Sequence, residues 1–146
     1  MEQKKVGFVL QAIKTEQFAI LVENLSHKKP LELGSQLQFK FDQKQKLIGV
    51  EIGFEYIQSK KVLLKIVVSC HFKIEVDSWQ SFLIIQEGKL VVPKGFLAHL
   101  AMITVGTARG VSHAKTESTD FSKFIIPAIN VVEMIPDDAV IDMVLN

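Results

Sequence analysis

Apolar and polar residues alternate almost without interruption over fifteen residues in the middle of the chain, from Val62 to Val76. Side chains in a β-strand point to opposite faces with a period of two. The pattern therefore predicts one long strand, roughly 50 Å at ~3.3 Å per residue. Its apolar face carries Val62, Leu64, Ile66, Val68, Cys70, Phe72, Ile74 and Val76, and its other face is mostly polar, with Lys65, Ser69, His71, Lys73 and Glu75.

Three strand regions of similar character precede it, at Val6–Val22, Gln36–Asp42 and Leu47–Tyr56. In the first region the apolar residues that share a parity are Phe8, Leu10, Ala12, Phe18, Ile20 and Val22, with a polar break over residues 14–17. Short polar turns join the later regions, and short connections favour an antiparallel meander. One face of this sheet should be solvated, because its side chains are polar: Gln36, Gln38, Lys40, Asp42, Glu51, Glu55, Lys65, His71, Lys73 and Glu75.

A helix is predicted after Pro93, a residue that suits the first turn of a helix. The helical stripe consists of Leu97, Leu100, Ala101, Thr104, Ala108 and Val111. Apolar residues also lie outside this stripe (Phe96, Met102, Ile103 and Val105), so we expect the helix to be covered on more than one side, the second side by another subunit. Residues 77–89 predict a short strand or a covering loop, and Asp137-Asp138 predicts the start of a short final helix.

These elements predict an α+β fold, with residues 1–146 forming a single domain in which a long helix covers one face of a four-stranded antiparallel sheet. The net charge of +1 gives no strong attraction to nucleic acid or to acidic membranes. The single cysteine, Cys70, cannot form an internal disulfide. The first residues contain no secretory signal pattern, and the longest uncharged run, Gly95–Ala108, is too short to cross a bilayer. We therefore expect a cytoplasmic protein.

Catalytic chemistry is not indicated by any motif. The four histidines match no zinc-site spacing, and Ser112 next to His113 is an adjacency in sequence rather than a catalytic triad. The sequence predicts no metal, no cofactor and no enzymatic activity. Arg109 is the only arginine and lies in an otherwise apolar helix, so we expect it to pair with a backbone carbonyl or a carboxylate.

Three short stretches carry a more specific signal. Gln36–Asp42 alternates and ends in Asp, Thr107–Gly110 contains Ala-Arg in the long helix, and Phe121–Asn130 is a connector interrupted by proline. Together with four strands followed by a long helix, these stretches resemble the bacterial SecB export chaperone family. The positions that carry most of the resemblance are Arg109, Phe121, Pro127 and Asn130, and it gives Arg109, Pro127 and Asn130 structural roles.

The resemblance implies a chaperone that binds unfolded or extended polypeptides in hydrophobic grooves and assembles as a homotetramer, a dimer of dimers. Our hypothesis is that the groove is bordered by Phe96, Leu97, Phe121, Phe124, Ile126 and Ile135. The export chaperones are strongly acidic, whereas this chain has a net charge of +1 and lysines on its solvated face. A dedicated client therefore fits better than hand-over to the translocase motor.

Two other classes of function remain open. One is a small-ligand-binding protein or an enzyme of the hot-dog type, such as a thioesterase; that fold places its long helix early, whereas here the helix follows the sheet. The other is an adaptor module whose apolar surface contacts one fixed partner. Binding of many clients would favour the chaperone, and one stoichiometric partner would favour the adaptor.

Overall fold

The computed structural model describes residues 5–21, 26 and 28–144. In chain order its elements are β1 (Phe8–Ile20), β2 (Glu32–Asp42), β3 (Leu47–Gln58), β4 (Lys61–Ile74), α1 (Val76–Ser81), β5 (Leu83–Ile84), the 3-10 turn η1 (Ile85–Glu87), β6 (Lys89–Val92), α2 (Lys94–Thr116) and β7 (Ala139–Asp142). The predicted α+β fold with a four-stranded antiparallel sheet and a long helix is confirmed.

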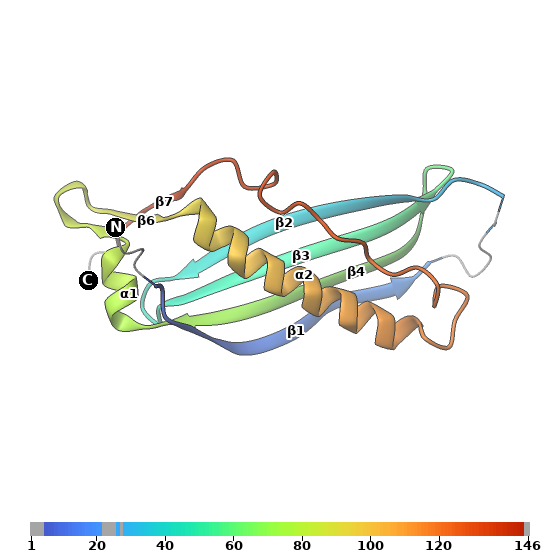
Figure 1. Ribbon diagram of the computed structural model, residues 1–146, viewed down its shortest axis with the longest axis horizontal. Coiled ribbons are helices and arrows are strands. Elements are labelled where there is room, and N and C mark those ends of the chain that lie inside the picture. The colour runs from blue at the N-terminus through green and yellow to red at the C-terminus, as the bar shows by residue number, and fades with distance from the viewer. Residues whose placement is uncertain (1–4, 22–25, 27, 145–146) are drawn as a thin grey trace.

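The large sheet has the strand order β1-β4-β3-β2 (Figure 1). Strands β2, β3 and β4 form the predicted meander, whereas β1 pairs with β4 at the far edge. Ser59 and Lys60 join β3 to β4, and both have positive φ. This is typical of the two-residue type I′ turn, whose twist matches that of the paired strands.

Two β-bulges shape the edge strand β1. Its register with β4 shifts between Leu10 and Ala12 and again between Thr15 and Gln17. Between the bulges Ile13 lies opposite Cys70, and Ala12 lies opposite His71. The prediction that Ala12 shares the face of Phe8 and Leu10 is therefore wrong, because an extra residue in the strand reverses the alternation. Val22, which was predicted for the same face, lies outside the described residues.

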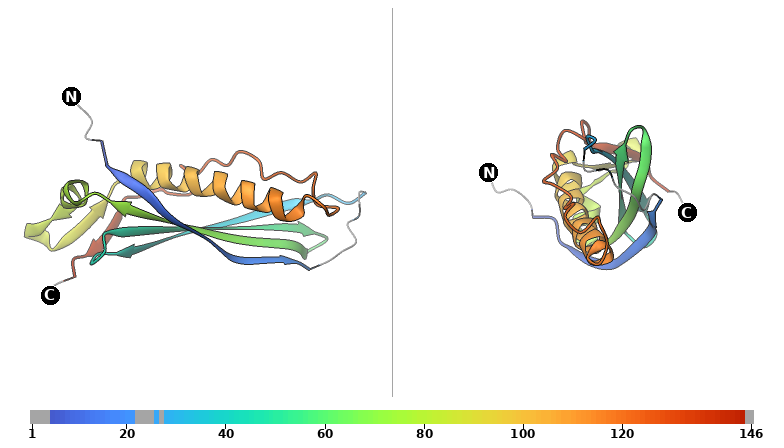
Figure 2. Two further views of the ribbon diagram at one scale, coloured as in Figure 1. Left: turned by 90° about the horizontal axis from the view of Figure 1, so that it is seen from below. Right: turned by 90° about the vertical axis from the view of Figure 1, so that its right-hand side faces the viewer.

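The core lies on one face of this sheet, which we call the inner face. The side chains of Ile48, Val50, Ile52 and Phe54 in β3 are completely buried there, as are their counterparts in β4. Helix α2 packs along the inner face over β3 and β4, as Figure 2 shows. The opposite, open face carries the polar parity of β2, β3 and β4 and has no covering layer in either figure.

Residues 76–92 form a helix and a hairpin. Helix α1 has one turn and a half, and Trp79 and Phe82 are buried on its inner side. Residues spaced three apart share a face of a helix, so both rings reach the core together. The predicted short strand is β5, and the predicted loop is partly replaced by α1 and η1.

The predicted final helix after Asp137-Asp138 is wrong. Residues 139–142 instead form β7, which pairs with β6 in an antiparallel arrangement. The Asp138 carboxylate does cap a helix, but the helix is α2: Lys94 N donates to Asp138 Oδ1 at 2.9 Å. Val140 and Ile141 are β-branched and fit a strand better than a helix.

Candidate polypeptide-binding surface

Residues 117–138 form an irregular stretch, with turns at 117–123 and 131–134, that we call the covering segment. It runs back beside α2 on the inner side of the sheet (Figure 1). Four of its side chains are buried, with exposed fractions of 6% or less: Phe121, Ile126, Val131 and Ile135. Phe124 is half-buried, with its ring centroid 5.9 Å from that of Tyr56 and 6.0 Å from that of Phe121. These side chains anchor the segment to the core.

Backbone carbonyls of the covering segment are held by Arg109 of α2. Its Nε donates to Ile126 O at 2.6 Å, and its Nη2 donates to Pro127 O at 2.9 Å. An irregular chain without strand neighbours needs such partners for its polar backbone. The guanidinium supplies two donors in a fixed geometry. Pro127 and Asn130 are themselves exposed.

Tyr56 provides another contact from the sheet to the segment. Its hydroxyl donates to Phe124 O at 3.5 Å, which is a long hydrogen bond. Burial raises the pKa of the Tyr56 hydroxyl, because the charged phenolate would be poorly solvated there. The hydroxyl therefore stays protonated and remains a donor near neutral pH.

The six residues predicted to border a groove do not meet at one place. Phe96 lies at the start of α2, where its ring centroid is 5.6 Å from that of Phe8 and 5.8 Å from that of Phe82. Phe121 and Phe124 lie beyond the other end of α2, which has 23 residues and is therefore roughly 33 Å long. Leu97, Phe121, Ile126 and Ile135 are buried within the chain, and only Phe96 and Phe124 are partly accessible.

Other apolar side chains of α2 and the covering segment are exposed; the sequence analysis named Met102 but missed Ile125 and Val132. Ile125 and Val132 of the covering segment are 61% and 62% exposed, and Met102 of α2 is 61% exposed. A hollow of about 340 Å³ lies where the end of β1 approaches the start of the segment, lined by Ile20, Thr119, Asp120 and Phe121. Alternation of buried and exposed residues around 124–132 is irregular, so no period in the sequence identified the outward positions.

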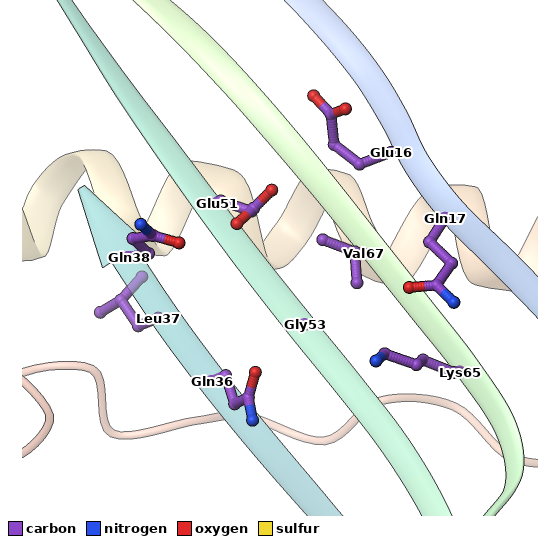
Figure 3. A pocket seen from close by; sticks show the side chains of 9 residues that line it. All are labelled: Glu16, Gln17, Gln36, Leu37, Gln38, Glu51, Gly53, Lys65 and Val67. Carbon is purple, nitrogen blue, oxygen red and sulfur yellow. The ribbon is translucent and has the colours of Figure 1, made fainter. Parts of the chain in front are cut away.

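The open face carries a different, polar hollow of about 680 Å³ (Figure 3). Gly53 forms part of its floor, and the side chains around it come from all four long strands: Glu16, Gln17, Gln36, Leu37, Gln38, Glu51, Lys65 and Val67. Lys65 pairs with Glu55 at 3.5 Å, and both are partly exposed. The hollow is therefore suited to water and polar groups rather than to apolar side chains.

Ser69, which is buried on the open face beside this hollow, bonds to two ionisable residues. Its Oγ donates to Glu16 Oε1 at 2.6 Å and lies 3.1 Å from His71 Nε2. Glu16 is at the second bulge of β1, which is why a residue 53 positions away reaches Ser69. In a Ser-His-acid triad the acid orients the histidine. Here the carboxylate bonds to the serine itself, so the geometry is not that of a triad.

No group of three or more His, Cys, Asp and Glu side chains among the described residues is arranged to hold a metal ion. No helix in the described part of the chain combines the length and the apolar composition needed to cross a membrane. His27 lies outside the described residues.

Comparison with known proteins shows a similarity of fold. No protein-family model matches the sequence, and no curated protein sequence matches it. Among solved structures, the chain is similar to a SecB-like chaperone from Mycobacterium tuberculosis, solved in complex with a ChAD peptide from the HigA1 antitoxin. The TM-score is 0.52 at 7% sequence identity, over 84% of this chain and 90% of the other. The fold of this protein is therefore SecB-like.

Proposed function

We propose that this protein is a chaperone that binds unfolded or extended polypeptides. The observation that carries the proposal is that three apolar side chains of the covering segment and α2, Ile125, Val132 and Met102, are each more than half exposed in a SecB-like fold. The solved neighbour of the same fold was captured with a peptide. Exposed apolar patches are typical of sites that bind other chains.

The covering segment is suited to such a client for a second reason. Its buried side chains and the Arg109 hydrogen bonds hold its backbone in place, while Ile125 and Val132 point outward. Binding by a pre-organised apolar surface loses little conformational entropy on the protein's side. The surface around Ile125 and Val132 is where we place the client, in preference to the buried Phe121.

The test is suppression of aggregation of a slowly refolding client, such as a denatured enzyme diluted into buffer. We expect suppression near stoichiometric amounts, which ends once the client is native. The double variant Ile125→Ser and Val132→Ser should bind the client at least tenfold more weakly, while its thermal unfolding stays within a few degrees of wild type, because both residues are exposed.

The matched control is Ile85→Ser. Ile85 is also an exposed aliphatic residue, but it lies in η1 between β5 and β6, away from the covering segment. This variant should suppress aggregation like wild type. If wild type does not suppress aggregation, the chaperone proposal is wrong; if only one protein from a lysate binds, in fixed stoichiometry, the adaptor function replaces it.

Assembly into a dimer of dimers is part of the same proposal. The free edge of β1 exposes Val9, Leu10 and Ile13, and α2 exposes Met102, so apolar surface is available on two sides of the protomer. An unpaired strand edge favours association with another strand. Sedimentation velocity of the purified protein tests the tetramer directly, and a monomer over the micromolar range would rule it out.

A further inference from the structure

The last six described residues, 139–144, lie between β6 and the turn that joins β2 to β3. We call these residues the strap, and we call the place that they occupy the slot. On one side β7 pairs with β6, with Ile141 opposite Leu90, and Met143 N donates to Gly88 O at 2.9 Å. On the other side the turn between β2 and β3 contributes the Gln43 amide. Its Nε2 donates to Asp142 O at 2.8 Å, and its Oε1 accepts from Val144 N at 3.1 Å. The strap is thus bonded along both edges.

Most of these bonds involve the backbone of the strap rather than its side chains. The β6 ladder, the Gly88 carbonyl and the Gln43 amide bond to main-chain atoms of the strap, which every extended chain carries. Main-chain bonding of this kind is how proteins add a foreign strand to a sheet edge, with alternate side chains giving specificity. The residues that face inward, Ala139, Ile141 and Met143, are all apolar.

The strap itself is weakly anchored, whereas the slot is part of the core. No strap residue is fully buried, and the ion pair between Lys89 and Asp142 is exposed to solvent. In contrast, Leu90 and Val92 of β6 are completely buried. A hollow of about 230 Å³ continues beside the strap, lined in part by Trp79 and Leu83. Segments with few buried contacts open locally at little free-energy cost.

We propose that the strap is an exchangeable strand: an extended client segment with apolar residues at alternate positions displaces it and adds to β6. The inference rests on the proposed function and gives it a second docking mode, in which the backbone of the client is recognised. The strap then acts as an internal competitor that keeps the edge of β6 covered until a client arrives.

A cross-strand disulfide tests this exchange in the full chain. Lys89 and Asp142 are partners in the register. Directly opposed residues of antiparallel strands have Cα atoms ~4.5–5.5 Å apart, within the range that a disulfide spans. The double variant Lys89→Cys and Asp142→Cys should lock the strap when oxidised and release it when reduced. Cys70 is fully buried and should not interfere.

The probe is a fluorescent peptide that copies residues 136–144, and its binding is measured by anisotropy. We expect the oxidised lock to bind it at least tenfold more weakly than the same protein after reduction. The single variant Ile141→Ala should bind it about tenfold more tightly than wild type, because the protein's own strand docks less well while the slot is unchanged. The same peptide carrying Ala139→Asp and Ile141→Asp should not bind.

Equal binding of the peptide by the oxidised and reduced lock would overturn the exchange. The aggregation assay on the same locked protein separates this failure from that of the proposed function. The oxidised protein could suppress aggregation and still bind the peptide with the same affinity as the reduced protein. That result would support the chaperone activity and contradict the exchange of the strap. Peptide binding that depends on the lock supports the exchange, whatever the client assay shows.

Discussion

Two different structures cover the inner face of the sheet side by side: helix α2 and the irregular covering segment. The helix satisfies its backbone internally and contributes a regular stripe of buried side chains, including Leu100 and Ala101. The segment forms no strand ladder: short turns join some of its backbone groups, such as Phe124 N to Phe121 O, and Arg109 binds two further carbonyls. The helix is thus stabilised by a continuous internal set of hydrogen bonds, whereas the segment is stabilised by isolated turns and by side chains of other elements.

This difference suggests a division of roles. The helix should unfold only with the whole domain, whereas the segment and the strap should open locally.

The largest effect is expected in the helix. Leu100→Ala should lower the free energy of unfolding by about 3 kcal/mol, because it leaves a cavity against the sheet. The urea midpoints measured by fluorescence and by circular dichroism should shift by the same amount. This would show that α2 and the sheet unfold as one unit. The control is Met102→Ala on the exposed side of α2, which should change the free energy by less than about 0.5 kcal/mol. Separate transitions for the two probes would contradict a single unit.

An intermediate effect is expected where α2 contacts the covering segment. Arg109→Ala removes both donors to Ile126 O and Pro127 O and should cost about 1–3 kcal/mol. Limited proteolysis should then cut residues 121–131 several times faster, while α2 remains protected. Arg109→Lys keeps the charge but not the two-donor geometry, so its cleavage rate should lie between those of wild type and Arg109→Ala. If α2 were cleaved as fast as the covering segment, the two would not open independently.

The smallest effect is expected at the strap. The Lys89 ammonium lowers the pKa of the Asp142 carboxyl through a hydrogen bond and through its charge. A carboxyl whose pKa is lower in the folded state stabilises the fold above its unfolded pKa, near 3.8, and this contribution is lost as the pH falls through the folded value. Hydrogen-exchange protection of the Met143 amide should therefore fall below about pH 4. In Asp142→Asn this pH dependence should disappear; if it persists, another group is responsible.

Regular periodicity predicted the helix and the four long strands, because each of them buries one face at a fixed spacing. The alternating pattern predicted β4, and the apolar stripe predicted α2, for this reason. The pairing of Arg109 was predictable as a need, since a lone charge in an apolar helix requires a partner, but not as a contact with residues 126 and 127 in particular.

The rest depended on contacts between distant residues. Asp138 accepts a hydrogen bond from the backbone of Lys94, 44 positions away, instead of starting a helix of its own. The strap is likewise held by Gln43, which is distant in sequence. The groove prediction chose large apolar residues by type, and four of them, Leu97, Phe121, Ile126 and Ile135, are buried rather than at the surface. Which side of an aperiodic segment faces outward is set by the sheet it packs on, and local sequence does not reveal that.

The bulges of β1 have a consequence for how chains of this fold vary in length. Gln11 and Glu16 are each an extra residue opposite a continuous partner strand. Deleting Gln11 would remove a bulge while every later residue kept its cross-strand neighbour and its face. A homologue can therefore lose or gain a residue at either place without moving Phe18 or Ile20 from the core side. Alignments of related chains should accordingly show their gaps within this strand, at two fixed points, and not only in the loops.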